Sequence, residues 1–99
     1  MKTLGTHNYY TYILTNKGKN VLYIGVTNNL KDRLVFHKSG SINSFTSRYR
    51  CFYLVYFEHY TDITAAIARE KQLKGWKRIR KIALIDSFNA DWRFLNEDI

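Results

Sequence analysis

The sequence contains a single cysteine, no proline and only eight acidic residues, against sixteen lysines and arginines. One cysteine excludes a disulfide framework and a zinc site built from cysteines. No apolar run is long enough to cross a bilayer, and residues 1–5 lack the apolar stretch of a signal peptide, so we expect a cytoplasmic protein without a membrane span. The shortage of acidic residues leaves a formal net charge of +8, which favours a polyanionic partner such as nucleic acid.

Apolar and aromatic side chains are plentiful in this chain. The hydrophobic fraction of 45% and the aromatic fraction of 16% are too high for a disordered tail, and they suffice for a folded core. A chain of 99 residues has the usual size of one domain. We therefore expect residues 1–99 to form a single domain that is a monomer or a weak homodimer.

The first part of the chain has the pattern of a β-hairpin. Residues 9–15 and 21–27 are rich in the aromatic and β-branched types that favour strands. Residues 16–20 between them have the composition of a turn, in which Gly18 is free to adopt a positive φ. The simplest arrangement is two antiparallel strands joined by this turn.

Helical and apolar patterns predict the elements that follow the hairpin. Residues 51–59 are nearly all apolar or aromatic, as in a strand buried on both faces. Residues 41–49 are polar and have no clear period, so we expect a loop there. Three helices are predicted, over residues 30–39, 63–74 and 77–87. Asn28-Asn29 can cap the first helix, and Gly40 stops it. Asp62 or Thr61 caps the second helix, and Gly75 interrupts it.

The order β-β-α-β-α-α defines the expected fold. It predicts an α/β fold of the α+β type, in which a small three-stranded antiparallel sheet is flanked by helices that cover both apolar faces. The last residues, among them Trp92, Phe94 and Leu95, are expected to pack back on the core.

One side of the helix predicted over residues 30–39 combines apolar and phosphate-binding side chains. Successive helical residues turn by about 100°, so Arg33 and His37 fall on the same side as two leucines. The leucines indicate that this side faces protein, which directs Arg33 and His37 along the sheet rather than into water. Two interpretations are open: an ordinary helix edge, with Arg33 paired to a carboxylate, or part of a functional site.

Glu70 lies in the middle of the apolar stripe of the helix predicted over residues 63–74. A carboxylate is seldom buried without a partner, so it pairs with a cation, accepts backbone hydrogen bonds or binds a metal ion. A structural ion pair with Arg33 and a Mg²⁺ site are the two main interpretations. The stripe comprises Ile63, Ala66, Ile67 and Leu73, and the outer face comprises Arg69, Lys71 and Gln72.

Phenol groups line one face of the predicted hairpin. Tyr23 shares its face with Gly25, and Tyr12 shares its face with Tyr10. Gly25 either allows a phosphate or another backbone to approach closely or marks a bulge. A tyrosine beside a bound cation and an arginine has its ionised form favoured, so Tyr12 or Tyr23 is a candidate proton acceptor.

Two basic segments are candidates for contact with nucleic acid. A solvated charged face is the ordinary interpretation of such a run, but the net charge and the interleaved aromatic residues favour contact with a nucleic-acid backbone. The shorter segment, residues 45–50, combines Thr46 and Arg48 with aromatic residues. The longer segment comprises Arg69, Lys71, Lys74, Trp76, Lys77, Arg78, Arg80 and Lys81.

These motifs resemble those of the GIY-YIG nuclease superfamily, and specifically of its short stand-alone bacterial members, the UPF0213-like proteins. The resemblance extends over residues 8–95, and its most specific feature is the second triad followed ten residues later by an arginine. The matching segments are Tyr10-Thr11-Tyr12 and Tyr23-Ile24-Gly25 for the two triads, Leu30-Lys31-Asp32-Arg33 and His37 for the next helix, residues 68–74 for the acidic residue, and Phe45-Thr46 and Asn89-Ala90-Asp91-Trp92 for the stand-alone group.

The resemblance implies hydrolysis of DNA phosphodiester bonds with one divalent cation, Mg²⁺ or Mn²⁺. By analogy, Glu70 would hold the metal ion, and Tyr23 or Tyr12 would help to deprotonate the attacking water. Arg33 and His37 would bind the scissile phosphate and stabilise the charge that builds on it. The implied substrate is DNA, branched or single-stranded forms included, cut with low or structure-directed specificity.

Several positions depart from the family pattern. Tyr10 stands where many members have glycine, and Val26 follows Gly25 where some repair nucleases carry lysine. Ile82 stands at the usual spacing of the late asparagine of the larger enzymes, and Asn89 is its candidate substitute among the nucleic-acid-binding residues. These departures concern the strength of catalysis more than the fold.

Three functions remain open at this point. The first is an endonuclease, and the second is a nucleic-acid-binding module that keeps the scaffold with weak turnover or none. The third is a protein-interaction domain whose charge is incidental, and its affinity for DNA would not depend on salt.

Overall fold

The computed structural model describes residues 7–39 and 45–99, so the helix stop expected at Gly40 and the start of the predicted loop lie outside the described residues. The α+β fold, the three-stranded antiparallel sheet and the predicted element order are confirmed, with a short helix and a C-terminal 3-10 turn in addition. No helix in the described part is long and apolar enough to cross a membrane. The elements are β1 (Tyr9–Thr15), β2 (Leu22–Thr27), α1 (Leu30–Ser39), α2 (Phe45–Tyr49), β3 (Tyr53–Tyr60), α3 (Ile63–Gly75), α4 (Arg78–Phe88) and η1 (Leu95–Asp98).

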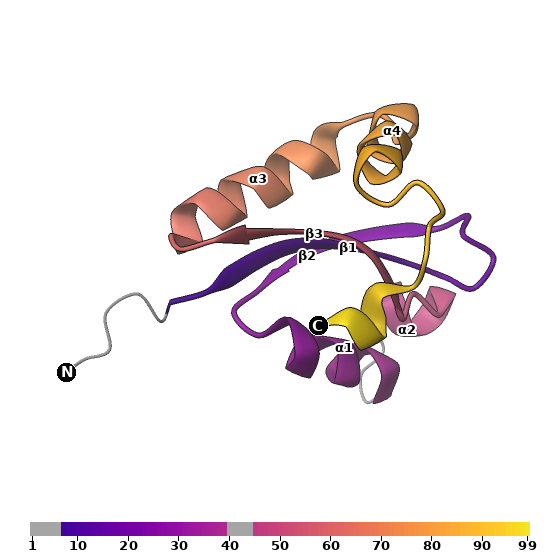
Figure 1. Ribbon diagram of the computed structural model, residues 1–99, viewed down its shortest axis with the longest axis horizontal. Coiled ribbons are helices and arrows are strands. Elements are labelled where there is room, and N and C mark those ends of the chain that lie inside the picture. The colour runs from indigo at the N-terminus through magenta and orange to yellow at the C-terminus, as the bar shows by residue number, and fades with distance from the viewer. Residues whose placement is uncertain (1–6, 40–44) are drawn as a thin grey trace.

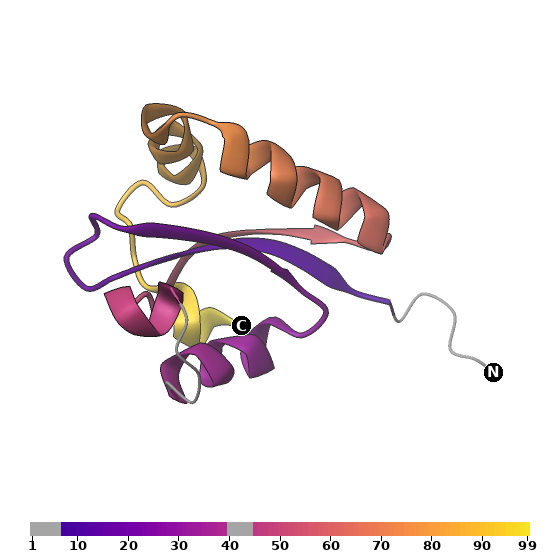
Figure 2. The same ribbon diagram turned by 180° about the vertical axis from the view of Figure 1, so that it is seen from behind.

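The sheet separates two layers of helices. Its strand order is β2-β1-β3, so β1 is central and pairs antiparallel with both neighbours. Helices α3 and α4 cover one face, whereas α1, α2 and η1 lie on the other, as Figure 1 and the reverse view in Figure 2 show. Side chains of β1 alternate between the faces: Tyr12 and Leu14 belong to the core cluster of α1, and Ile13 to the cluster of α3 and α4.

Asparagine side chains, rather than a glycine, shape the turn of the hairpin. Asn16 Oδ1 accepts hydrogen bonds from the backbone N–H groups of Asn20 and Val21, at 3.0 and 3.2 Å. The residue with a positive φ is Lys19, at 61°, and Gly18 stays outside the left-handed region. The expectation for Gly18 is therefore wrong, because the asparagine hydrogen bonds place the left-handed residue one position later.

A short helix replaces the last part of the loop predicted over residues 41–49. With only five residues, α2 is too short to show a helical period in the sequence. Tertiary contacts hold it instead. The Phe45 ring stacks on Tyr23 with the centroids 6.0 Å apart, and the Thr46 hydroxyl contacts His37. α2 therefore links the hairpin to α1.

The start of α3 agrees with the predicted cap, but its faces differ from the prediction. Asp62 Oδ1 accepts a hydrogen bond from Thr64 N–H at 3.3 Å, which confirms the cap. Ile63, predicted in the apolar stripe, is 48% exposed because the buried stripe begins one turn later. Arg69, predicted on the outer face, is half-buried, and its Nη2 lies 3.0 Å from Glu58 Oε2 on β3. The helical pattern alone cannot show that this carboxylate lies within reach.

A β-bulge in β3 is closed by a side chain from the C-terminal part of the protein. The pairing of β1 with β3 shifts between Ile13 and Leu14, which leaves Val55 without an opposite residue. Asn89 Nδ2 donates a hydrogen bond to the Val55 carbonyl at 3.1 Å and a second to the Arg93 carbonyl at 2.8 Å. Asn89 Oδ1 accepts from Arg93 N–H at 3.0 Å. One buried amide thus satisfies the bulge and the chain that follows α4.

A second asparagine covers the adjacent part of the same strand. Asn96, in η1, donates from Nδ2 to the Phe52 carbonyl at 2.9 Å. Its Oδ1 accepts from Leu54 N–H, also at 2.9 Å. Leu95 beside it is 6% exposed and belongs to the core cluster of α1, which confirms that the tail packs back on the core.

Substitution of Asn89 by alanine should lower the free energy of unfolding by about 2–4 kcal/mol, because each buried polar group left without a partner costs about 1–3 kcal/mol. Urea denaturation followed by circular dichroism measures the change. Asn28→Ala, at an exposed asparagine, is the matched control and should stay within about 0.5 kcal/mol of the parent. Equal stability of the two variants would contradict the role given to Asn89.

Candidate functional site

Two tyrosines and a histidine form the centre of the site, on the face of the sheet that α1 covers. The strand register pairs Leu14 with Tyr23 and Tyr12 with Gly25, so both phenols point to the same face. The centroids of the two tyrosine rings are 6.4 Å apart. The His37 ring lies 6.1 Å from Tyr12 and 5.5 Å from Tyr23. The structure therefore brings together three of the predicted residues, from β1, β2 and α1.

Both ring nitrogens of His37 are engaged by other side chains. Nε2 lies 2.9 Å from Tyr12 Oη, and Nδ1 lies 2.8 Å from Thr46 Oγ1. Burial, together with the neighbouring Arg33 guanidinium, lowers the pKa of His37, so the imidazole is neutral near pH 7. Direct contact of His37 with a phosphate would require one of the two hydrogen bonds to break.

Thr46, expected among the nucleic-acid-binding residues, lies beneath the surface. It is 1% exposed, and its hydroxyl contacts His37. A nucleic acid on the surface of α2 therefore does not reach this side chain. The basic-aromatic pattern of residues 45–50 could not reveal this, because it does not show which side of so short a helix faces inward.

Gly25 provides the space that the Tyr12 ring occupies. A Cβ atom at this position would lie 2.5 Å from Tyr12 Oη and 2.6 Å from Tyr12 Cζ, closer than real Cβ contacts. The pairing of β1 with β2 runs through Gly25 without a shift, which rules out a bulge there. The space beside this glycine is taken by the phenol of Tyr12, rather than by the phosphate or the backbone that were expected to approach there.

The surroundings of Tyr12 keep its phenol protonated. Burial raises its pKa well above the ordinary value, and Tyr23 and Glu70 act in the same direction. The neighbouring Arg33 guanidinium acts in the opposite direction and is outweighed. Arg33 therefore favours the ionised form of Tyr12, as expected, but desolvation of the buried ring outweighs this effect and keeps the phenol protonated.

Glu70 approaches the same tyrosine from α3. Its side chain is 15% exposed, and its carboxylate is near enough to raise the pKa of the Tyr12 phenol. Oε2 lies 2.7 Å from Nζ of Lys74, one turn further along α3. Arg33 does not form the ion pair with Glu70 that was one of the two interpretations. Its guanidinium instead lies 5.9 Å from the centroid of the Phe36 ring, and its charge acts on the Tyr12 phenol.

The donor set around Glu70 suits a hard divalent cation that keeps most of its water. The described residues contain no group of three or more histidine, cysteine or acidic side chains that could enclose a metal ion. Mg²⁺ is commonly bound by one or two carboxylates together with water and substrate phosphate oxygens. The partner of Glu70 is the side chain of Lys74, which is 53% exposed and free to swing into solvent. Glu70 therefore fits such an ion.

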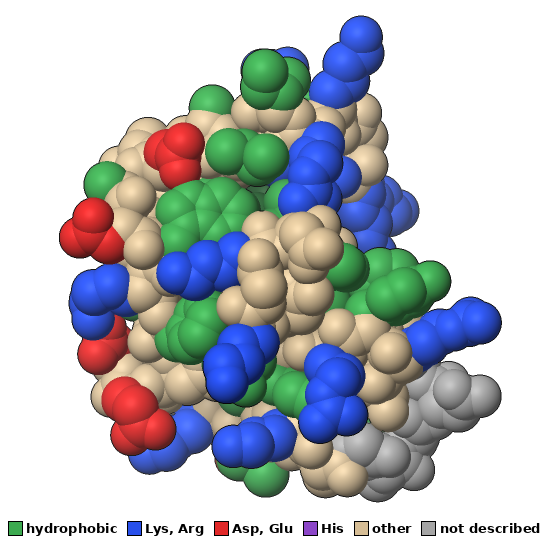
Figure 3. Space-filling model, turned by 90° about the vertical axis from the view of Figure 1, so that its right-hand side faces the viewer, with side chains coloured by type: hydrophobic (Ala, Val, Ile, Leu, Met, Phe, Trp, Pro, Cys, Tyr) green, Lys and Arg blue, Asp and Glu red, His purple; other side chains and the backbone are tan. Residues whose placement is uncertain are grey.

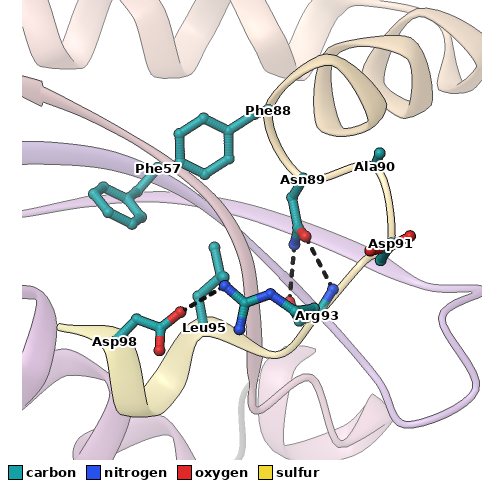
Figure 4. Close-up of a pocket in the computed structure, with 8 residues that line it drawn as sticks. All are labelled: Phe57, Phe88, Asn89, Ala90, Asp91, Arg93, Leu95 and Asp98. Atoms are coloured by element: carbon teal, nitrogen blue, oxygen red, sulfur yellow. Dashed lines mark hydrogen bonds and ion pairs between the residues drawn. The ribbon is translucent and has the colours of Figure 1, made fainter.

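Asn89, also expected among the nucleic-acid-binding residues, has a structural position. It is 8% exposed, and Figure 4 shows its amide directed at the backbone of Arg93, beside the pocket between α4 and η1. Its hydrogen bonds to Val55 and Arg93 use both the amide nitrogen and the amide oxygen. A nucleic acid could bind Asn89 only by opening the bulge of β3.

Exposed cations dominate the end of the molecule where the β1–β2 turn, α2 and α4 lie. Figure 3 shows lysine and arginine side chains across this end, with acidic side chains towards one margin. Arg48, Lys74, Lys77 and Arg78 are exposed, as a role in nucleic-acid binding requires. Arg78 Nη2 also donates a hydrogen bond to the Asn20 carbonyl at 2.7 Å, which fastens α4 to the turn.

Trp76, another of the predicted nucleic-acid-binding residues, already contacts two arginines. The guanidinium of Arg80 lies 4.0 Å from the ring centroid and that of Arg69 lies 5.1 Å from it. The ring also packs against the core cluster of α3 and α4. A nucleobase could stack on Trp76 only by displacing an arginine, so the geometry favours a role at the junction of the two helices.

Two exposed lysines in the turn had no predicted role. Lys17 and Lys19 lie in the β1–β2 turn, at the end of the molecule that carries the other cations. The sequence could have indicated their exposure, because both lysines lie within the turn segment, between the two predicted strands.

Comparison with known proteins relates this geometry to a family. The GIY-YIG catalytic domain matches residues 8–83, the span that carries all the residues of the hairpin, α1 and α3 described above. The chain belongs to the GIY-YIG family. This is a family of nucleases, which generally use divalent metal ions and act on nucleic acid. The resemblance noted in the sequence is thereby confirmed.

Small bacterial GIY-YIG proteins are among the relatives. A UPF0213 protein of Clostridium perfringens is 38% identical over 78 residues, which are 79% of this chain and 83% of the relative. A UPF0213 protein of Bacillus pumilus is 33% identical over 85 residues, 86% of each chain. The solution NMR structure of a UPF0213 protein from Bacillus halodurans is similar with a TM-score of 0.56 and 27% identity, covering 86% of this chain and 89% of that chain.

Gly25→Ala should displace the Tyr12 ring and destabilise the protein by about 1–3 kcal/mol, the usual cost of overpacking a core. Gly75→Ala is the matched control, because a Cβ atom there meets nothing within 4 Å and alanine favours the helix. Urea denaturation measures both variants, and the ring signals of His37 in NMR spectra report on its contact with Tyr12. A Gly25→Ala variant as stable as the parent would contradict the close approach.

Proposed function

We propose that this GIY-YIG protein is a metal-dependent endonuclease that hydrolyses phosphodiester bonds in DNA. The proposal is carried by the surroundings of the Tyr12 phenol: His37 Nε2 lies 2.9 Å from its oxygen, and the charges of Arg33 and Glu70 both act on it. Tyr23 lies beside the same ring. A carboxylate, a guanidinium and a second phenol thus act on or lie beside one phenol oxygen. Phosphoryl transfer depends on positioning and charge neutralisation, which these groups supply.

Glu70 would hold the divalent ion, Mg²⁺ or Mn²⁺. Its carboxylate is half-buried, and its partner Lys74 is exposed enough to leave. When bound, a divalent ion supplies neutralisation of phosphate charge and a more acidic water molecule. Lys74 would then be released towards the nucleic acid, in keeping with its place on the basic end of the protein.

Tyr23 is better suited than Tyr12 to accept a proton from the attacking water. Tyr12 is 0% exposed, its Oη contacts His37, and burial keeps it protonated. Tyr23 is only partly buried, next to Phe45 at the edge of α2. The two phenols are equivalent candidates in the sequence, and their different burial favours Tyr23.

Arg33 would bind the scissile phosphate and stabilise the charge that builds on it. A guanidinium has five N–H donors, so Arg33 beside Tyr12 has donors available for phosphate oxygens. His37 would contribute through Tyr12, because both of its ring nitrogens are engaged within the protein.

The basic end of the protein would bind the backbone of the substrate. Exposed cations from the β1–β2 turn, α2 and α4 gather there, and α2 also contacts the site through Phe45. Branched and single-stranded DNA are included among the proposed substrates, with low or structure-directed specificity. The proposed form is a monomer or a weak homodimer in the cytoplasm.

The second candidate function is a nucleic-acid-binding module with weak turnover or none. Two observations favour it. The pKa of Tyr12 is raised by burial, which removes one of the two candidate bases. Val26 occupies the position where some GIY-YIG repair nucleases carry lysine, which removes a further candidate base.

Glu70→Gln should reduce cleavage of plasmid or branched DNA by about 100-fold or more, because the amide cannot hold the cation that neutralises the phosphate. The rate of nicking of supercoiled plasmid with Mg²⁺ or Mn²⁺ measures the loss. Glu58→Gln is the matched control, since Glu58 is similarly half-buried and paired with a cation, Arg69, outside the site. It should cut at the parent rate wherever circular dichroism shows it folded.

Two outcomes of this experiment would change the conclusion. Cleavage by Glu70→Gln at the parent rate would remove Glu70 from the metal site. A parent protein that binds DNA but cuts no substrate with any divalent ion would establish the second candidate function instead.

Lys77→Ala should weaken DNA binding for all sequences alike and reduce the slope of log K against log salt by about 0.9 on duplex DNA, because one counterion fewer is released. Lys77 makes no side-chain cap to α4, so the change removes a charge and no helix cap. Fluorescence anisotropy at several salt concentrations measures it, with Lys31→Ala on the exposed side of α1 as control. Affinity that does not fall with salt would indicate that the charge is incidental.

A further inference from the structure

We propose that Thr46 is a positioning residue: its hydroxyl accepts a hydrogen bond from His37 Nδ1–H and so fixes the imidazole tautomer whose Nε2 accepts the phenol proton of Tyr12. The consequence for cleavage rests on the proposed nuclease function, whereas the tautomer does not. In this proposal α2 orients His37, instead of contacting the substrate through Thr46.

The contacts of His37 connect three separate elements. Thr46 comes from α2, His37 from α1 and Tyr12 from β1, and the two contacts between them are 2.8 and 2.9 Å. All three side chains are buried, with exposures of 1%, 7% and 0%. Because water does not reach these atoms, each polar group depends on its neighbours for hydrogen bonds.

The protons available to these groups select one tautomer. The Tyr12 phenol has one proton to donate, and the Arg33 guanidinium whose charge acts on it carries donors only, so the proton goes to His37 Nε2, 2.9 Å from Tyr12 Oη. A neutral imidazole carries one N–H group, so an Nε2 that accepts leaves the proton on Nδ1. The atom that receives this proton is Oγ1 of Thr46. The raised pKa of Tyr12 and the lowered pKa of His37 agree with both groups being neutral.

The backbone around Thr46 holds the hydroxyl in place. The Thr46 carbonyl accepts a hydrogen bond from Cys51 N–H at 2.9 Å, which closes α2 against the start of β3. Phe45, the preceding residue, stacks on Tyr23. α2 is therefore fixed on both sides of the hydroxyl, as expected for an element that orients another side chain.

The tautomer matters because the Arg33 guanidinium also acts on the Tyr12 oxygen. If the proton moved to Nε2, His37 and Arg33 would both donate to Tyr12 Oη, and the phenol proton would lose its partner. Two donors would then compete for the same oxygen, and the Arg33 guanidinium would lose its defined position. The hydroxyl of Thr46 thus acts on the proposed phosphate-binding residue through two intervening side chains, from Thr46 to His37 to Tyr12 to Arg33.

The test compares Thr46→Val, which keeps the shape and removes the hydroxyl, with Thr46→Ser, which keeps the hydroxyl. Long-range ¹H–¹⁵N correlation spectra show which ring nitrogen of His37 carries the proton, with the signals assigned from a His37→Gln variant. We expect Nδ1–H in the parent and in Thr46→Ser, and a shift of the proton to Nε2 in Thr46→Val. Thr15→Val is the matched control, because Thr15 is also buried and its hydroxyl binds the Val21 carbonyl.

Cleavage kinetics give the second measurement. Thr46→Val should lower kcat by about 10- to 100-fold, the usual effect of removing a group that orients a functional residue, and should leave KM nearly unchanged. Thr46→Ser should retain most of the parent rate, and Thr15→Val should retain all of it.

Three results would overturn the proposal: Nε2–H in the parent protein, an unchanged tautomer in Thr46→Val, or a Thr46→Ser variant with the spectrum of Thr46→Val. The parent spectrum and Thr46→Ser decide the matter even where Thr46→Val fails to fold. A parent protein with the expected tautomer and no cleavage would remove the nuclease function and leave the positioning of His37 intact.

Discussion

The contact between the Tyr12 phenol and the Gly25 backbone is the constraint on which the rest of the site depends. The ring has room only because position 25 carries no side chain. Once seated there, its oxygen lies where His37 and Arg33 of α1 can both reach it. The strand register places this oxygen on the face that α1 covers, His37 of α1 contacts it, and α2 contacts His37 through Thr46. A single close packing contact therefore determines the positions of several polar groups.

The same arrangement gives the two tyrosines of the site different environments. Tyr12 and Tyr23 lie side by side, yet Tyr12 is sealed within the core and Tyr23 is partly open beside Phe45. Desolvation makes the first a fixed hydrogen-bond partner, and exposure leaves the second accessible to solvent and ligands. Glu70 contributes from α3, on the other side of the sheet, so the site depends on both layers of helices (Figure 1).

Local signals in the sequence predict much of the fold, and long-range contacts account for what they miss. The predicted ranges 9–15 and 30–39 coincide with β1 and α1, because side-chain alternation and caps are properties of neighbouring residues. The residues gathered around Tyr12 were also predictable from shared faces. Their hydrogen-bond partners were not. Asn89 binds Val55 across 34 positions of the chain, and no periodicity reports on such a pair. The inward side of α2 likewise follows only from contacts with other elements.

The asparagines that bind β3 have a consequence for the solubility of the protein. An edge strand offers unpaired backbone groups to any passing strand, which is a common route to aggregation. Here the amides of Asn89 and Asn96 occupy carbonyls of Val55 and Phe52, and Asn96 also takes up the N–H of Leu54. Along this stretch, two asparagine side chains thus occupy backbone groups that a further strand would bind. The segment after α4 therefore hinders the pairing of β3 with a strand of another molecule.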